Sequence, residues 1–81
     1  MTRNEIDGYY GVEFLYADGF DDAIIGVELY TGEPKLVYSV KKCIEILKRQ
    51  DMTDDEAIEY FEFNIAGSYV GEQTPLWIEK I

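Results

Sequence analysis

The sequence has no histidine, a single cysteine and no long apolar run. The missing histidine removes the side chain that most often acts as a general base or a metal ligand near neutral pH. One cysteine, Cys43, allows neither an internal disulfide nor a zinc site built from several thiolates, and it fits a reducing compartment. No segment approaches the roughly 18 apolar residues of a membrane span, and the first residues lack the pattern of a signal peptide. We therefore expect a cytoplasmic protein.

Basic residues are also scarce, because seven Lys and Arg stand against seventeen Asp and Glu, for a net charge of −10. They are unevenly placed: residues 34–50 hold five bases and one acid, whereas residues 1–33 and 51–81 each hold eight acids and one base. An acidic chain is repelled by phosphates, so we expect no direct nucleic-acid partner. The hydrophobic content of 47% and aromatic content of 15% indicate a packed core rather than disorder.

The hydrophobic pattern predicts one α+β domain over residues 1–81, with a small sheet of three or four mainly antiparallel strands packed by a helical hairpin. Strands are predicted at 9–16, 23–30, 35–38 and 76–78. The first would place Tyr10, Val12, Phe14 and Tyr16 on one face, within an N-terminal extension (1–17) that precedes the core (18–78). The second would turn Ile25, Val27 and Leu29 to one face, although so short an apolar run is also compatible with a helix.

Two helices are predicted between the last two strands. The first begins after Ser39 as N-cap and has opposite apolar and basic faces. The apolar residues are Val40, Cys43, Ile44 and Leu47, and the basic face holds Lys41, Lys42, Lys48 and Arg49. The second begins with a capping box formed by Thr53 and Glu56 and ends at Gly67. Its inward stripe is Ala57, Ile58, Phe61 and Ile65.

Three acids close to Gly19 are the main candidate for a cation site. Asp18, Asp21 and Asp22 offer carboxylate oxygens, which Mg²⁺ and Ca²⁺ prefer. Their spacing does not match an EF-hand loop, and turn chemistry explains Asp and Gly here equally well. The basic helix face offers a phosphate or RNA site, although a solvated amphipathic helix has the same pattern. No serine has an activating base near it in sequence, so we expect no hydrolase chemistry and no cofactor.

Aromatic residues outside the predicted stripes are candidates for a binding surface. Phe63 lies beside Glu59, either as an exposed interface anchor or under a loop or the last strand, and we favour the covered arrangement. Asn64 is predicted to bond backbone and to fix the loop after Gly67. The strand tyrosines either form a binding surface or cover the sheet. Cys43 is predicted to be an inert core residue.

Several segments resemble a group of small uncharacterised proteins common in phages and bacteria. They include DGFDDAIIG at 18–26 and, most specifically, FNIAGSYVGEQTP at 63–75. The resemblance implies a phage origin, and with it a location in the host cytoplasm. It assigns no catalytic residue, because no activity is established for the group.

The leading hypothesis is a non-enzymatic acidic interaction module, a phage accessory protein that binds a host or phage protein, with DNA mimicry and inhibition as one version. The candidate partner-binding residues are Tyr9, Tyr10, Tyr16, Asp18, Asp21, Asp22, Glu28, Glu59 and Phe63. One alternative is a carboxylate-based Mg²⁺- or Ca²⁺-binding domain or metal-dependent enzyme. Another is a homo-oligomeric structural component, such as a homodimer paired through a strand edge.

Overall fold

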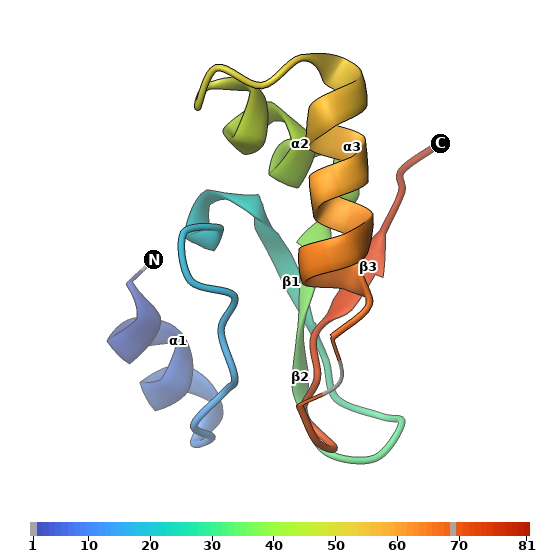
Figure 1. The fold of residues 1–81 in the computed structure, drawn as a ribbon. Helices are drawn as coiled ribbons and strands as arrows, with labels where there is room; N and C mark the ends of the chain where they lie inside the picture. Colours follow the sequence, from blue (N-terminus) through green and yellow to red (C-terminus); the bar gives the residue numbers. More distant parts are fainter. Residues whose placement is uncertain (1, 69) are drawn as a thin grey trace.

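A computed structural model, which describes residues 2–68 and 70–81, has a three-stranded sheet covered on one face by helices (Figure 1). The strands lie in the order β1-β2-β3. Their bounds are β1 Ile24–Glu28, β2 Lys35–Ser39 and β3 Leu76–Ile78, and the helical elements are α1 Arg3–Tyr10, η1 Asp21–Ala23, α2 Val40–Lys48, α3 Asp54–Phe61 and η2 Glu62–Ala66. The predicted α+β class is confirmed. The sheet is mixed, since β1 pairs antiparallel with β2 but β3 runs parallel to β2. Parallel neighbours need a long crossover, which α2, α3 and η2 provide.

The N-terminal segment contains a helix, so the strand predicted at 9–16 is wrong. Thr2 is the N-cap of α1, and its side chain and that of Glu5 form a reciprocal capping box with each other's backbone N–H groups. Gly11 ends the helix in the left-handed conformation, at φ 66°. The aromatic pair Tyr9 and Tyr10 suggested a strand, but the local capping signals decide the structure here.

The chain from Val12 to Ala17 belongs to no helix or strand, and Asp18 and Gly19 then form a turn that a hydrogen bond from the Phe20 N–H to the Ala17 carbonyl closes. The predicted alternation is present, because Phe14 is buried while Glu13 and Leu15 are exposed. Side chains satisfy its backbone: the Asp7 carboxylate accepts from the Phe14 N–H at 3.3 Å, and the Tyr38 hydroxyl accepts from the Ala17 N–H at 2.8 Å. This segment therefore packs over the sheet through its side chains instead of extending the ladder.

A bulge in β1 changes which residues face the core. Ile24 pairs with Tyr38 and Gly26 with Val37, so Ile25 is an extra residue between two successive pairs. The predicted strand is confirmed, but the prediction that Ile25 and Leu29 turn inward with Val27 is wrong. Ile24 and Val27 pack against the core, whereas Ile25 and Leu29 are exposed. At Ile25 the alternating pattern fails because the bulge shifts the two-residue period, whereas Leu29 lies beyond the end of β1.

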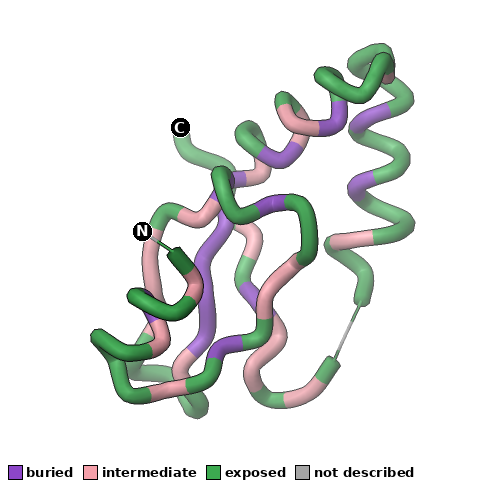
Figure 2. Tube along the Cα trace, turned by 90° about the vertical axis from the view of Figure 1, so that its left-hand side faces the viewer, coloured by how far each residue is buried: buried purple, intermediate pink, exposed green. Residues whose placement is uncertain are grey.

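The central strand β2 is buried along its whole length (Figure 2). Leu36 and Tyr38 face the core, with the Tyr38 ring 4.9 Å from the Trp77 ring of β3 between centroids. Trp77 in turn meets the edge of Phe61 from α3 at 5.4 Å. This aromatic cluster joins the sheet to the helical hairpin.

The helical hairpin follows the prediction closely. Ser39 caps α2 by accepting from the Lys42 N–H, and Thr53 with Glu56 forms the capping box of α3. The apolar stripe faces inward except for Ile58, which is exposed. A π-helical segment, η2, extends α3 until Gly67, the predicted end. Within the residues described, no helix is long and apolar enough to cross a membrane.

The second face of the sheet carries apolar side chains outside the core cluster. Register places Val37, Leu76 and Ile78 on the face opposite Tyr38 and Trp77, together with the bulged Ile25. Ile25, Leu76 and Ile78 are exposed and Val37 is buried, and none of the four residues belongs to the core cluster. We call these four residues the outer sheet face.

We predict that Tyr38→Phe destabilises the protein by about 1–2 kcal/mol, because the half-buried N–H of Ala17 then loses its acceptor. For a domain of this size that lowers the Tm by roughly 5–10 °C. Thermal unfolding followed by circular dichroism measures the change. Tyr30→Phe is the matched control, because the Tyr30 side chain is 91% exposed. An unchanged Tm in Tyr38→Phe would contradict the proposed anchor.

Candidate functional site

A groove of about 560 Å³ lies between residues 15–20, which include the turn at Asp18 and Gly19, and the helical hairpin with β3. Its walls come from five parts of the chain. Apolar groups line most of it: Leu15, Tyr16, Ala17, Phe20, Leu47, Tyr60, Ile65, Val70, Pro75 and Trp77. Asp18, Gly19, Gln50, Asn64 and Ser68 complete the lining. An apolar hollow of this volume with a few polar groups is typical of a binding site.

One buried polar group of a residue beside the groove has no partner among the described residues. The indole Nε1–H of Trp77 is buried and finds no acceptor in the described part of the chain. The ring is held between Tyr38 and Phe61, so it cannot turn freely toward another acceptor. Such an unsatisfied donor costs about 1–3 kcal/mol.

The three acids predicted as a cation site are arranged around an arginine. The Arg3 guanidinium lies 3.1 Å from the Asp18 carboxylate and bonds both oxygens of Asp21, at 2.8 and 2.9 Å. The hydrogen bond to Asp21 is the main factor that raises the pKa of Arg3. Asp22 is exposed and makes neither contact. No group of three metal-ligating side chains occurs among residues 2–68 and 70–81, so the metal hypothesis gains no support from this geometry.

The tyrosines proposed for partner binding do not share a strand face. Tyr9 and Tyr10 lie at the end of α1, with ring centroids 4.8 Å apart. Tyr16 has a structural role: its hydroxyl bonds the Asp7 carboxylate at 2.7 Å, and the Arg3 guanidinium lies 4.5 Å above its ring. Burial, followed by the Asp7 contact, raises the pKa of Tyr16. Of these three tyrosines, Tyr9 is the most exposed and therefore the most accessible to a partner.

Glu28 is likewise engaged within the fold. Its carboxylate accepts from the Thr31 hydroxyl and from the N–H groups of Tyr30 and Thr31, and it lies 3.6 Å from the Lys35 ammonium. The Thr31 hydroxyl is the main cause of a lowered pKa of Glu28. This carboxylate therefore holds the β1–β2 turn.

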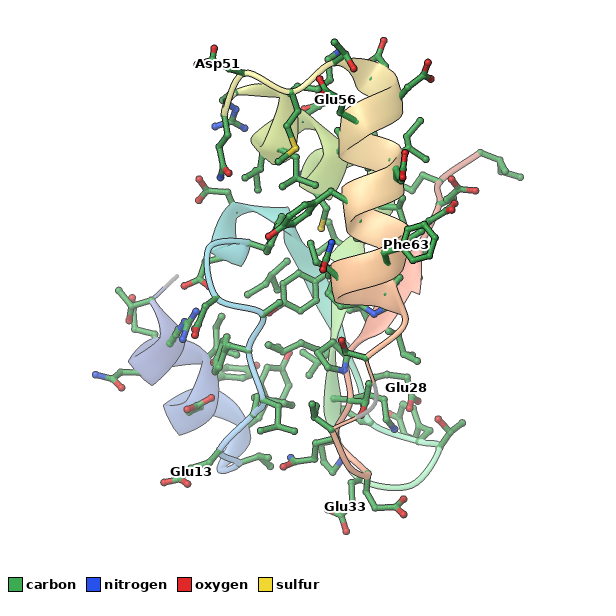
Figure 3. The ribbon with its side chains drawn as sticks, in the orientation of Figure 1. Glu13, Glu28, Glu33, Asp51, Glu56 and Phe63 are labelled. Atoms are coloured by element: carbon green, nitrogen blue, oxygen red, sulfur yellow. The ribbon has the colours of Figure 1, made fainter. Side chains whose placement is uncertain are left out.

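Phe63 is 79% exposed on η2, so the favoured prediction that a loop or strand covers it is wrong. It projects from the side of the helix that leads out of α3 (Figure 3). Glu59 and Phe63 share a shallow depression with Met52, Glu56, Tyr60 and Asn64, which we call the Phe63 surface. Asn64 donates to the Tyr60 carbonyl at 3.2 Å within its own helix, and so does not fix the loop after Gly67 as predicted.

The acids are spread over the molecule. Figure 3 shows Asp51 and Glu56 at one end, and Glu13 and Glu33 near the opposite end. The basic face is interrupted too: Lys48 pairs with Asp54 at 2.7 Å, and a wider hollow of about 850 Å³ along α2 and α3 is lined by acids as well as by Lys41 and Lys48. Among the described residues, the acids labelled in Figure 3 therefore lie at separate places, and acids interrupt the basic face of α2.

Sequence reasoning missed the groove. Its lining residues are separated by up to 62 positions, and their proximity depends on the crossover that makes β3 parallel to β2. A weak signal existed in Trp77, a large side chain with a polar N–H in a strand too short to enclose it.

We predict that Cys43 resists thiol labelling in the native state. Its side chain is fully buried, and burial raises its pKa to about 11. Reaction with a disulfide reagent at pH 8 should be slower than for the unfolded chain by at least about a hundredfold, because labelling requires both exposure and a thiolate. Stopped-flow measurement with and without denaturant tests this, and equal rates would show that the core does not cover the Cys43 thiol.

Comparison with known proteins finds no matching family model, no matching curated protein and no matching solved structure. The resemblance to the phage and bacterial group therefore stays a prediction, and the geometry of the described residues is the basis for a function.

Proposed function

We propose that this chain is a non-enzymatic protein-interaction module that binds a basic segment of another protein through the Phe63 surface. The observation behind the proposal is an exposed aromatic ring on a helix that has acidic residues but no basic ones. From Asp54 to Ala66 the chain holds five acids and no Lys or Arg. In keeping with the resemblance, we propose a phage accessory protein whose partner is a host or phage protein.

The chemistry of the surface suits a partner that combines a basic and an apolar group. Phe63 offers an aromatic face that an arginine or an apolar side chain can cover. The carboxylate of Glu59 lies on the same surface, one helical turn away, and Tyr60 adds a half-exposed ring. Fields of one sign speed the encounter with an oppositely charged partner, and their effect falls with salt.

DNA mimicry is a weaker version of this proposal. A mimic needs carboxylates in a row that imitates phosphates. Several acids of this chain have local partners instead: Glu5 and Glu56 cap helices, Glu28 holds a turn, and Asp21 pairs with Arg3. Contact through one aromatic surface is the simpler account.

We predict that Phe63→Ala weakens the partner complex at least about tenfold, since truncation of a central aromatic anchor commonly costs more than 1 kcal/mol. Capture from lysate of the source or host cell identifies the partner, and titration calorimetry with the purified partner gives the Kd. Tyr30→Ala and Tyr9→Ala are matched controls, because both rings are exposed and neither belongs to the Phe63 surface. Equal losses in all three variants would refute the assignment. A Kd insensitive to NaCl would refute the charge component.

A second proposal concerns self-association through the outer sheet face. Three exposed apolar side chains lie together there, and the neighbouring Glu28 and Lys35 form an ion pair, so this face lacks the repulsive charge of the rest of the surface. Two copies packed face to face would cover it, since sheets pack in this way. This arrangement differs from the strand-edge pairing expected from the sequence.

We predict that light scattering gives a mass near twice 9.4 kDa at high protein concentration. Ile78→Lys should restore the monomer, because a charge would be buried against the second copy. Ile58→Lys is the control, since Ile58 is similarly exposed but lies on α3. A wild-type monomer at every concentration would exclude this second proposal without affecting the first.

A further inference from the structure

The ring of Phe63 points away from the core, although its neighbours along the chain pack inward. Phe61, two positions earlier, is buried with its ring 5.4 Å from that of Trp77, and two residues of a helix differ by about 200° in direction. Phe63 therefore projects from the outer side of the helix (Figure 3). It belongs to the π-helical turn η2, and such turns are rare and frequent at functional sites. The Asn64 side chain, which bonds the Tyr60 carbonyl, holds this turn in place.

Two carboxylates lie along the same side of the helix as the ring. Glu59 precedes Phe63 by one turn, about 6 Å along the axis, and forms no ion pair within the described part of the chain. One oxygen of Glu56, Oε1, accepts from the Thr53 N–H at 2.9 Å. This bond lowers the pKa of Glu56 and keeps its carboxylate ionised and in position. The lining of the Phe63 surface contains no Lys or Arg to balance the two charges.

This combination of groups disfavours several occupants. A second copy bound through the same surface would place acids against acids. An apolar side chain would cover Phe63 but would remove water from the Glu59 carboxylate without replacing its hydrogen bonds. A metal ion would lack ligands, since no group of three metal-ligating side chains occurs among residues 2–68 and 70–81. A cation with a flat face fits both the ring and the carboxylate.

We propose that the partner's basic segment is recognised through an arginine, whose guanidinium stacks on the Phe63 ring and bonds the Glu59 carboxylate. This inference rests on the proposed function and names the chemistry of its partner. The guanidinium is planar and weakly hydrated and carries its donors at its edge, so one group covers a ring and bonds a carboxylate. A lysine ammonium is a compact, strongly hydrated charge, which makes a smaller contact with the ring and no bidentate bond.

The Glu56 carboxylate fits a second basic residue of the same segment. It lies seven residues before Phe63, about 10 Å along the helix axis. An extended chain covers this distance in three residues, at about 3.3 Å each. Tyr60, which is 43% exposed, lies between the two carboxylate positions along the same surface. The segment that fits best is therefore extended and has two arginines separated by two residues.

The test compares two short peptides of the same length and charge. The first is acetyl-GRAARG-amide, and the second is its lysine analogue, acetyl-GKAAKG-amide. Titration followed by ¹H–¹⁵N spectra gives both Kd values and shows which backbone signals move. We expect saturable shifts at the Phe63 surface and a Kd at least about threefold lower for the arginine peptide. Equal Kd values, or no saturable binding of either peptide, would overturn the proposal.

Two substitutions separate the ring from the charge. Phe63→Leu keeps an apolar side chain but removes the aromatic face, so we expect it to abolish the preference for arginine. Glu59→Gln should weaken binding of the arginine peptide at least about threefold, because the charged acceptor is lost. Glu13→Gln is the matched control, since it removes the same charge from an exposed side chain near the opposite end of the molecule (Figure 3). Equal weakening by the two Gln variants would indicate a general charge effect and would contradict the assignment.

The outcomes also distinguish this proposal from the proposed function. If Phe63→Ala loses the protein partner but the two peptides bind equally, arginine recognition is wrong and the proposed function stands. If the arginine peptide is preferred but Phe63→Ala keeps the partner, the partner does not use this site, and both proposals are wrong. Loss of the partner in Phe63→Ala, together with loss of arginine preference in Phe63→Leu, would support both.

Discussion

The burial of β2 is the constraint on which the rest of the structure depends. Five consecutive residues are buried, so both faces and both edges of this strand must be covered or paired. Leu36 and Tyr38 lie on the inner face of β2. Together with residues of α1, of segment 12–20 and of the helical hairpin they form one core. Tyr38 is central because its ring contacts Trp77 while its hydroxyl bonds Ala17. An 81-residue chain has little apolar surface to spare, so one buried strand must organise several elements.

Local signals were sufficient to predict the hairpin of helices and insufficient for the sheet. Ser39, Thr53 and Glu56 cap helices through bonds within three residues, and such bonds depend little on the rest of the fold. The capping box of Thr2 and Glu5 was equally local, but the aromatic run after it suggested a strand. The bulge at Ile25 and the parallel pairing of β3 depend on distant partners, and no window of sequence contains them. The groove could not be predicted for the same reason, because residues far apart in the sequence, such as Leu15 and Trp77, line it together.

The distribution of acids shows why net charge is a poor guide to a site. Of the nine residues proposed to bind a partner, Tyr16, Asp18, Asp21 and Glu28 are engaged with neighbours inside the fold. The Asp18 and Asp21 carboxylates pair with Arg3, the Tyr16 hydroxyl bonds Asp7, and the Glu28 carboxylate accepts from backbone N–H groups. A partner would have to displace these internal contacts in order to bind the same groups. Glu59 and Phe63 remain on one surface, and Tyr9 remains on α1. Charge attracts a partner over distance, whereas an uncovered apolar ring fixes the point of contact.

Trp77 borders both the groove and the hollow along α2 and α3, and its buried N–H has no partner among the described residues. The outer sheet face offers only exposed apolar area, and any apolar surface of similar size could pack against it. At Trp77 the aromatic contacts that stabilise the core also hold a donor in place without an acceptor, so packing and hydrogen bonding are in conflict. A natural fold tolerates such a conflict where the packing gained exceeds the cost of the unmade hydrogen bond. A phenylalanine would fill much of the same space without the unsatisfied donor, so at this position the larger indole is kept for its contacts with Tyr38 and Phe61.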